Sequence, residues 1–233
     1  LITGTLKEVT DLSHIEVTGV DLTGADLDVE LDTLVLANTN QFTMTYAQAN
    51  ALTLQGSEGA NTLYIDVHSL FSEGQTSADL HVSIDALGGD DLVRFLFGDG
   101  DVDRTLVLDA LSVIQLGEGN NTLESRSGTL DLSAVPSEQL SGITNFKINS
   151  EITLSADQFA DMLGQLSASG GGGGLLGSGV VHVIGELTGS RVIDLNQLTS
   201  FVAGGASLPT IDFPSGYQGR ALNDGDNGEQ FIE

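Results

Sequence analysis

A short pattern occurs three times between residues 52 and 123, and it constrains the fold more than any other feature of the sequence. The copies are Gly59-Ala60-Asn61-Thr62-Leu63, Gly88-Gly89-Asp90-Asp91-Leu92 and Gly119-Asn120-Asn121-Thr122-Leu123. In each copy a glycine stands two residues before Asn or Asp and four before Leu, and an alternating apolar run precedes it. The first glycines are separated by 29 and then by 31 residues. A period in this range is typical of stacked-repeat architectures.

Each copy has the chemistry of a strand, a tight turn and a second strand. Glycine adopts a positive φ without steric cost, and Asn or Asp tolerates that conformation while bonding to its own backbone. We therefore assign the turns to Gly59, Gly88 and Gly119, together with Asn61 and Asn121. One such unit is too thin to bury its own apolar face, so successive units must stack. The sequence predicts an all-β fold, a right-handed parallel β-solenoid (β-helix) with turns of about 30 residues.

The same residues carry a resemblance to a known family. The segments Gly56–Tyr64 and Gly117–Leu123 resemble the Gly-Gly-x-Gly-x-Asp-x-apolar-x nonapeptide of RTX, or haemolysin-type calcium-binding, proteins. In that family the Asp and the turn carbonyls of successive turns hold Ca²⁺. Here the Asp position is filled by Asn61, Asp90 and Asn121, and the copies are spaced along the chain instead of standing in tandem. The resemblance implies a solenoid that keeps the turn geometry with less metal, and Ca²⁺ as its cofactor.

Several acidic side chains are candidate calcium ligands. Asp99, Asp101 and Asp103 have the Asp-x-Asp-x-Asp spacing that wraps carboxylates around a hard cation, but Arg104 and Ala110 stand where an EF-hand needs Gly and Glu. The alternative is an acidic loop that is solvated at the edge of the solenoid. The full candidate set is Asp90, Asp91, Asp99, Asp101, Asp103, Asp224 and Asp226.

The charge of the chain excludes some classes of partner. Its 233 residues hold 7 Lys and Arg against 33 Asp and Glu, a formal net charge of −26, and no Cys. Such an acidic chain is unsuited to nucleic acid or to anionic membrane surfaces, because both bind basic patches. Alternating apolar runs and a 40% hydrophobic content argue against disorder.

Acidity, glycine richness and the absence of Cys together fit an exported protein of the bacterial cell surface, so we predict an extracellular location. The chain opens with Leu1-Ile2-Thr3-Gly4, which is not a signal peptide, and we expect a processed or excised piece. No apolar run reaches the roughly 20 residues that a membrane span needs, so we predict no transmembrane segment.

Two segments share a helix-capping pattern. In Phe42–Leu52 and in Ile152–Met162 an apolar-Thr-apolar strand start is followed by Thr45 or Ser155, and a Gln stands three residues later. Ser or Thr with Gln at this spacing forms a capping box, so the pattern predicts a short helix after each strand. The motif is similar to one in very large repetitive bacterial surface proteins, where helical turns interrupt strand runs.

The domain prediction is one solenoid body over residues 1–206 and an irregular acidic tail or cap over 207–233. Five glycines, 170–174, lie inside a predicted loop or hinge at 167–179. Val180–Ile184 is the most strongly β-branched run, and we expect a central strand there.

Catalytic patterns are weak in this sequence. His14, His68, His81 and His182 are scattered, there is no thiol, and no Gly-x-Ser-x-Gly elbow occurs. Neighbouring residues of a strand point to opposite faces, so adjacent carboxylates cannot flank one glycosidic bond unless the turn re-aims them. We therefore assign no catalytic residues and expect no enzyme.

The function we predict is structural: a module of an extracellular bacterial surface, adhesin, biofilm-matrix, filament or surface-layer protein. It would self-associate head-to-tail through its solenoid ends or form part of a longer chain, because exposed strand edges pair with other chains. The alternative is a carbohydrate-active or carbohydrate-binding β-helix, for which Tyr46, Tyr64 and Tyr217 are the available tyrosines. A third hypothesis is an RTX-like calcium-driven folding module that aids secretion.

Overall fold

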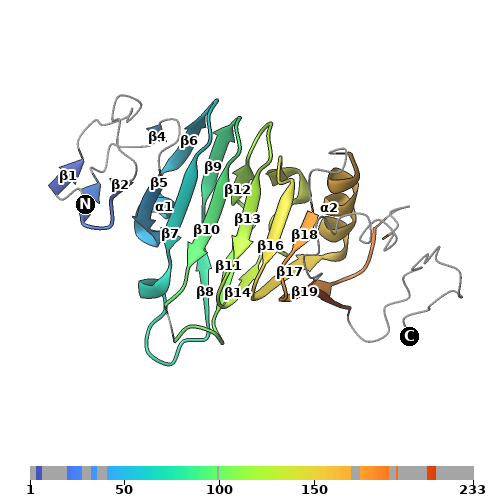
Figure 1. The fold of residues 1–233 in the computed structure, drawn as a ribbon. Coiled ribbons are helices and arrows are strands. Elements are labelled where there is room, and N and C mark those ends of the chain that lie inside the picture. The colour runs from blue at the N-terminus through green and yellow to red at the C-terminus, as the bar shows by residue number, and fades with distance from the viewer. Residues whose placement is uncertain are drawn as a thin grey trace, which may run out of the picture.

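The strands of this chain are parallel and form three main sheets (Figure 1). The computed structural model describes residues 4–6, 20–27, 33–35, 41–98, 100–168, 174–188, 193 and 209–213. Within these ranges every strand pairing is parallel. The predicted all-β class with parallel strands is confirmed.

The three main sheets are numbered 1 to 3 in order of decreasing strand number. Sheet 1 has seven strands: β2 (Val20–Asp21), β5 (Gln41–Thr45), β7 (Thr62–Asp66), β10 (Leu92–Leu96), β13 (Thr122–Ser125), β16 (Asn145–Ile148) and β18 (Gly174–Leu176). Sheet 2 has six strands: β8 (Ser77–Leu80), β11 (Thr105–Leu108), β14 (Thr129–Asp131), β17 (Glu151–Ser155), β19 (Val180–Ile184) and β20 (Thr210–Asp212). Sheet 3 has five strands: β4 (Thr33–Val35), β6 (Thr53–Ser57), β9 (Ser83–Leu87), β12 (Val113–Gln115) and β15 (Leu140–Ser141). A separate pair joins β1 (Gly4–Leu6) to β3 (Ala25–Leu27).

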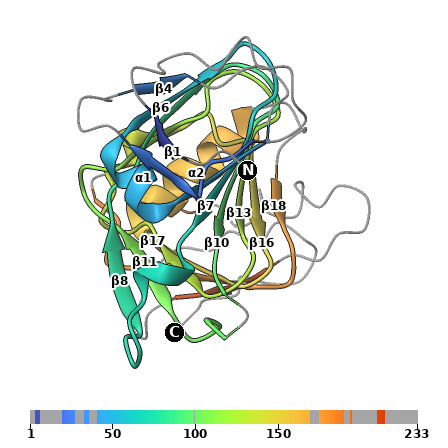
Figure 2. The ribbon, with the colours of Figure 1, turned by 90° about the vertical axis from the view of Figure 1, so that its left-hand side faces the viewer.

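The chain visits the three sheets in turn, as in a parallel β-helix. β7, β8 and β9 lie in sheets 1, 2 and 3, and the next two sets of three strands repeat that order. Figure 2, a view along the stack, shows the sheets on different sides of a common interior. Each passage through the sheets is called a coil below.

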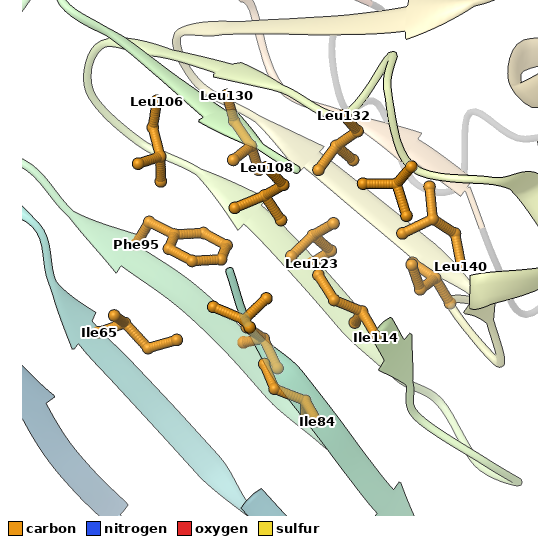
Figure 3. Packing of buried hydrophobic residues seen from close by; sticks show 14 of the residues in the cluster. Ile65, Ile84, Phe95, Leu106, Leu108, Ile114, Leu123, Leu130, Leu132 and Leu140 are labelled. Carbon is orange, nitrogen blue, oxygen red and sulfur yellow. The ribbon is translucent and has the colours of Figure 1, made fainter. Parts of the chain in front are cut away.

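Alternation of side chains fills that interior. In β10 the residues Val93 and Phe95 are buried, whereas Leu92, Arg94 and Leu96 are not. The period of two is that of a strand with one face on the core. Figure 3 shows how side chains from all three sheets meet; it labels Ile65, Phe95 and Leu123 of sheet 1, Leu106 and Leu130 of sheet 2, and Ile84 and Ile114 of sheet 3. Each such side chain contributes about 1.5–3 kcal/mol when it is fully buried.

The register between coils corrects the predicted alignment of the second sequence copy. Leu92 pairs with Thr62 in the coil before it and with Thr122 in the coil after it. Gly89, not Gly88, therefore matches Gly59 and Gly119, and Asp91, not Asp90, matches the two asparagines of the pattern.

Backbone conformation gives the physical reason for this shift. Gly89 and Gly119 have φ values of 113° and 131°, whereas neither Gly59 nor Gly88 has a positive φ. A Cβ on Gly89 would collide with the carbonyl group of Gly59 in the coil before it. The turn therefore needs glycine at position 89, both for its conformation and for the close approach of the two coils.

Two helices take the place of strands. α1 (Tyr46–Ala51) follows β5 and precedes β6, where other coils have a strand of sheet 2, and α2 (Ala156–Ala168) follows β17, where other coils have a strand of sheet 3. Figure 1 shows α1 towards the N-terminal end of the stack and α2 towards its C-terminal end. Both helices begin at the predicted caps, which confirms the capping pattern. Short 3₁₀ turns, η1 (His68–Leu70) and η2 (Ser137–Gln139), occupy two corners.

Sheet 2 includes a short part of the predicted C-terminal tail or cap, since β20 pairs with β19. The predicted central strand is β19, which pairs with β17 on one side and β20 on the other. Of the predicted hinge, residues 169–173 lie outside the described residues, and so does most of the tail. In the described ranges no helix is long and apolar enough to cross a membrane.

Candidate functional site

The most specialised side chains of the described structure bridge consecutive coils. Asn61, Asp91 and Asn121 form a buried ladder at the corner between sheets 3 and 1, with exposed fractions of 3%, 3% and 0%. The Asn61 backbone N–H donates to Asp91 Oδ1 over 2.7 Å, and the Asp91 N–H donates to Asn121 Oδ1 over 2.9 Å. Each rung thus pairs a backbone donor that the turn leaves free.

Asn121 completes its rung with the other end of its side chain. Its Nδ2 donates to the carbonyl oxygens of Leu116 at 2.8 Å, Gly117 at 3.2 Å and Gly142 at 2.9 Å. The last of these carbonyls belongs to the following coil. The amide therefore ties three turns of backbone together, and this is the chemistry that Asn offers and a carboxylate does not.

Asp91 has no such completion. Its Oδ2 is buried and has no hydrogen-bond partner among the described residues. Burial raises the pKa of Asp91 to about 6; the Asn61 N–H opposes this rise, and the charge of Asp90 adds to it. Asp91 also lines a small cavity of about 10 Å³ whose accessible wall is apolar.

A second ladder lies on the outer face of sheet 1. Glu124 of β13 accepts hydrogen bonds from the guanidinium of Arg94 in β10 and, at 3.1 Å, from Asn149 Nδ2. The Lys147 ammonium of β16 is 3.5 Å from the same carboxylate. These neighbours cover the Glu124 side chain, which is only 2% exposed although it points outward. On the other side of Arg94, its guanidinium lies over the Tyr64 ring, 5.0 Å from the centroid.

A third cluster lies where the chain leaves sheet 1 for sheet 2. His68 Nδ1 is 2.6 Å from Asp101 Oδ2, which also accepts from the Gly98 N–H, and Arg104 Nε is 2.7 Å from Asp101 Oδ1. Burial opposes ionisation of Asp101, but these partners outweigh it and hold its pKa below the ordinary value. The hydrogen bond to Asp101 in turn raises the pKa of His68. Phe71 stacks on Phe97 beside this cluster, with ring centroids 5.9 Å apart.

Two glutamines fasten the helices to the preceding coil. Gln48 Nε2 donates to the Leu22 and Ala25 carbonyl oxygens, each at 2.7 Å, and Gln158 Nε2 donates to those of Leu132, at 2.6 Å, and Val135. Their Oε1 atoms accept from the backbone N–H of the cap residues Thr45 and Ser155. Each glutamine therefore closes a capping box and bonds to the neighbouring corner at once.

Among the residues that the structure describes, the predicted calcium ligands do not gather into one group. Asp90 is exposed and its Oδ1 accepts from the Asn120 N–H, whereas Asp91 belongs to the buried ladder. Asp101 is held by His68 and Arg104, and Asp103 is exposed beside it. Asp99, Asp224 and Asp226 lie outside the described residues. Within the described ranges, no three His, Asp or Glu side chains form a group that could hold a metal ion.

The histidines of the described ranges pair with carboxylates. His81 Nδ1 is 3.2 Å from Asp109 Oδ1, and the Ser112 hydroxyl donates to the same carboxylate over 3.1 Å. That serine contacts the acid and not the imidazole, so the arrangement lacks the nucleophile–base contact of a catalytic triad. His182 lies 3.2 Å from Asp212 on the next strand of sheet 2. These pairs, too, join one coil to the next.

Sequence reasoning missed most of these contacts. The pairs of Arg94 with Glu124 and of Asn61 with Asp91 are separated by 30 residues, and this spacing was the available signal. Of the tyrosines proposed for sugar binding, Tyr64 is covered by Arg94, Tyr46 packs against the core, and Tyr217 lies outside the described residues.

Comparison with known proteins adds no assignment. A scan against protein-family models, a search of curated proteins and a search of solved structures each find no match to this chain.

Proposed function

We propose that this chain is a structural module, a stiff rod segment of an extracellular bacterial surface, adhesin, biofilm-matrix or filament protein. In this proposal the coils wind in a right-handed β-solenoid with turns of about 30 residues in its central part. The mechanism is mechanical: each coil bonds to its neighbours, and the acidic flanks keep the rod soluble. The resemblance of its corners to RTX repeats belongs to the same proposal.

One observation carries the proposal. The conspicuous polar groups of the described residues form hydrogen bonds from one coil to the next, and so join segments that are distant in the sequence. They are the ladder of Asn61, the Arg94–Glu124 pair, the His68–Asp101 pair and the bonds of Gln158 to the preceding coil. In an enzyme, such groups converge on one cavity where a substrate atom can sit. Here they are distributed along the stack, which is the arrangement that resists pulling and unfolding.

Self-association through the ends of the stack is the second part of the proposal. Parallel sheets that end in an unpaired strand present backbone donors and acceptors to another chain. Negative-stain electron microscopy and analytical ultracentrifugation of the purified chain over a concentration series test this. We expect rods whose length grows with concentration while their width stays constant. Compact particles of one mass at every concentration would contradict head-to-tail assembly.

We also propose that the acidic segments 99–103 and 224–226 bind Ca²⁺. Extracellular-type calcium sites bind at about 10⁻⁴ to 10⁻³ M, so about 5 mM CaCl₂ fills them. We expect this addition to raise the urea midpoint of unfolding more than NaCl of equal ionic strength does. Asp103→Asn should remove part of the difference, and Asp79→Asn on the outer face of sheet 2 is the matched control. Equal effects of the two salts would rule out specific sites.

A further inference from the structure

Asp91 occupies a rung that is built for an amide. In the next coil Asn121 donates its Nδ2 protons to carbonyl oxygens, and at Asp91 the second branch of the side chain is an oxygen instead. Because the two coils keep one register, the carbonyls of Ala86 and Leu87 correspond to those that Asn121 bonds in its own coil. By this register, Asp91 Oδ2 corresponds to the donor Nδ2 of Asn121.

An ionised carboxylate is poorly matched to this place. Its Oδ2 would carry charge in a site that is 3% exposed, with no described donor to pair with it. A buried carboxylate that lacks a donor for one oxygen is destabilised, and the group responds by taking up a proton. A neutral carboxyl instead has an O–H that can donate, as the asparagine amide does.

The surrounding charges favour the neutral form. Asp90 is the adjacent residue in the same turn, Glu58 lies on the corner of the coil before, and Glu118 lies on the corner of the coil after. All three are acids, and the cavity that Asp91 lines has no basic residue among its described lining. The accessible wall of this cavity is apolar, so it offers the charged form of the carboxyl no polar partner.

We propose that Asp91 is a proton-binding site within the ladder, and that its neutral carboxyl O–H takes the place of the amide that Asn121 uses in the next coil. The ligand is a proton. The central coil is thereby strengthened in mild acid and weakened when the proton leaves. This inference does not depend on the proposed function, because it concerns the stability of the coil alone.

The sign of the pH dependence follows from the two states. The pKa of Asp91 is about 6 in the folded chain, against 3.8 for an ordinary aspartate. The folded chain therefore binds the proton more tightly, and this contribution to stability appears as the pH falls from 7 towards 4 and is lost above about pH 6. A difference of about two pKa units corresponds to a change of up to about 100-fold in the unfolding equilibrium constant.

Urea unfolding of the wild type, Asp91→Asn and Asp90→Asn at pH 4 and pH 8 tests the proposal. Asp90→Asn is the matched control, since it removes the same charge from an exposed neighbour. We expect Asp91→Asn to lower the unfolding constant up to about 100-fold at pH 8, and to change it only about twofold at pH 4, where both the folded and the unfolded wild type are largely protonated. Asp90→Asn should keep most of the wild-type difference between the two pH values.

A direct measurement keeps the proposal falsifiable if a variant fails to fold. The ¹³C shift of the Asp91 carboxyl in the wild type should titrate with a midpoint near pH 6. A midpoint below pH 4.5, or an Asp91→Asn variant less stable than the wild type at pH 8, would overturn the proposal. Calcium that stabilises the wild type at pH 8 but not Asp91→Asn, at matched ionic strength, would also overturn it, because the site would then hold a metal ion.

Discussion

Leu87 is the one residue other than glycine with a positive φ in the described part of the chain, at 67°. The next coil has Gly117 at the corresponding position, also at 67°, and there the conformation carries no penalty. A leucine in the left-handed region costs roughly 1–2 kcal/mol. The strain is tolerated because the bonds of the coils before and after fix the turn.

Replacing Leu87 by glycine should destabilise the protein less than replacing it by alanine. Both changes lose a side chain that is only 39% exposed, but glycine also relieves the left-handed strain of roughly 1–2 kcal/mol against an added chain entropy of about 0.5–1 kcal/mol, so we expect the glycine variant to be more stable than the alanine variant by about 0.5–1 kcal/mol. Urea unfolding at pH 7 measures the difference. The control is Leu111, a leucine that is 73% exposed and has no positive φ, where the alanine variant should be the more stable one. The same order of the two variants at both positions would refute the strain argument.

The His68–Asp101 pair makes the corner between sheets 1 and 2 dependent on pH. The pKa of His68 is raised, so its contribution is fully present below about pH 6.5 and is lost as the pH rises through the folded value. The pKa of Asp101 is lowered, so its contribution is lost in acid below about pH 4. In an NMR titration we expect the His68 ring to titrate above pH 6.5. In Asp101→Asn the ring should titrate at a lower pH; an unchanged midpoint would show that the pair does not form in solution.

Ambiguity at one residue limited what the sequence could predict here. In Gly88-Gly89-Asp90-Asp91 both glycines and both aspartates fit the pattern, and a shift by one residue exchanges an exposed acid for a buried one. Only the hydrogen bonds between coils decide which of the two aspartates is buried, and those bonds depend on residues of the neighbouring coils.

The helices α1 and α2 show which hydrogen bonds depend on the local sequence and which depend on stacking of the coils. Gln48 and Gln158 each make both kinds of bond, and the set of bonds of each glutamine is called a glutamine bracket here. The Thr or Ser with Gln three residues later is a contact within one segment, so the sequence predicted both helix starts correctly. The carbonyls of Leu132 and Val135 that Gln158 also bonds belong to the preceding coil. Their place beside the helix depends on how coils stack, which no local pattern contains.

Removing one bracket should loosen α2. Gln158→Ala removes the side-chain donor of the Val135 carbonyl and one of the two donors of the Leu132 carbonyl, and it opens the capping box, so we expect a loss of about 2–4 kcal/mol. Thermal unfolding measures the loss, and amide exchange should quicken in α2 and η2 before it does in β10. Gln165→Ala, on an exposed position of the same helix, is the matched control. If Gln158→Ala and Gln165→Ala lowered the stability by similar amounts, the hydrogen bonds of Gln158 would contribute little to it.

The whole molecule carries a large uniform charge. A formal net charge of −26 repels itself more strongly in the folded chain than in the expanded one. Raising NaCl from about 0.01 M to 0.15 M shortens the screening length from about 30 Å to 8 Å, so we expect the melting temperature to rise. KCl at the same ionic strength should act equally if screening is the cause. A melting temperature that falls with salt would show that the attractive ion pairs outweigh the repulsion.

Within the central coils, the pairing was predictable in sheets 1 and 3 and not in sheet 2. Between β6 and β13 the paired positions of sheets 1 and 3 recur at one constant spacing, and the sequence repeats visibly. In sheet 2 the spacing is not constant: Thr105 pairs with Ser77 before it and with Thr129 after it, because the corners differ in length. Because the corner lengths vary, the strands of sheet 2 do not recur at a fixed spacing in the sequence, although they still pair with one another in the structure.

The constant register of the central coils also determines how such a chain can change in length over generations. Excision of residues 62–91 would bring Leu92 to the place of Thr62 with its alternation intact, so every later strand would keep its buried face. Loss of one residue fewer or more would turn the following strand inside out. Gene segments that encode one complete coil are therefore the units in which a lineage could lengthen or shorten this stack of coils, and proteins descended from a common ancestor would differ by whole coils.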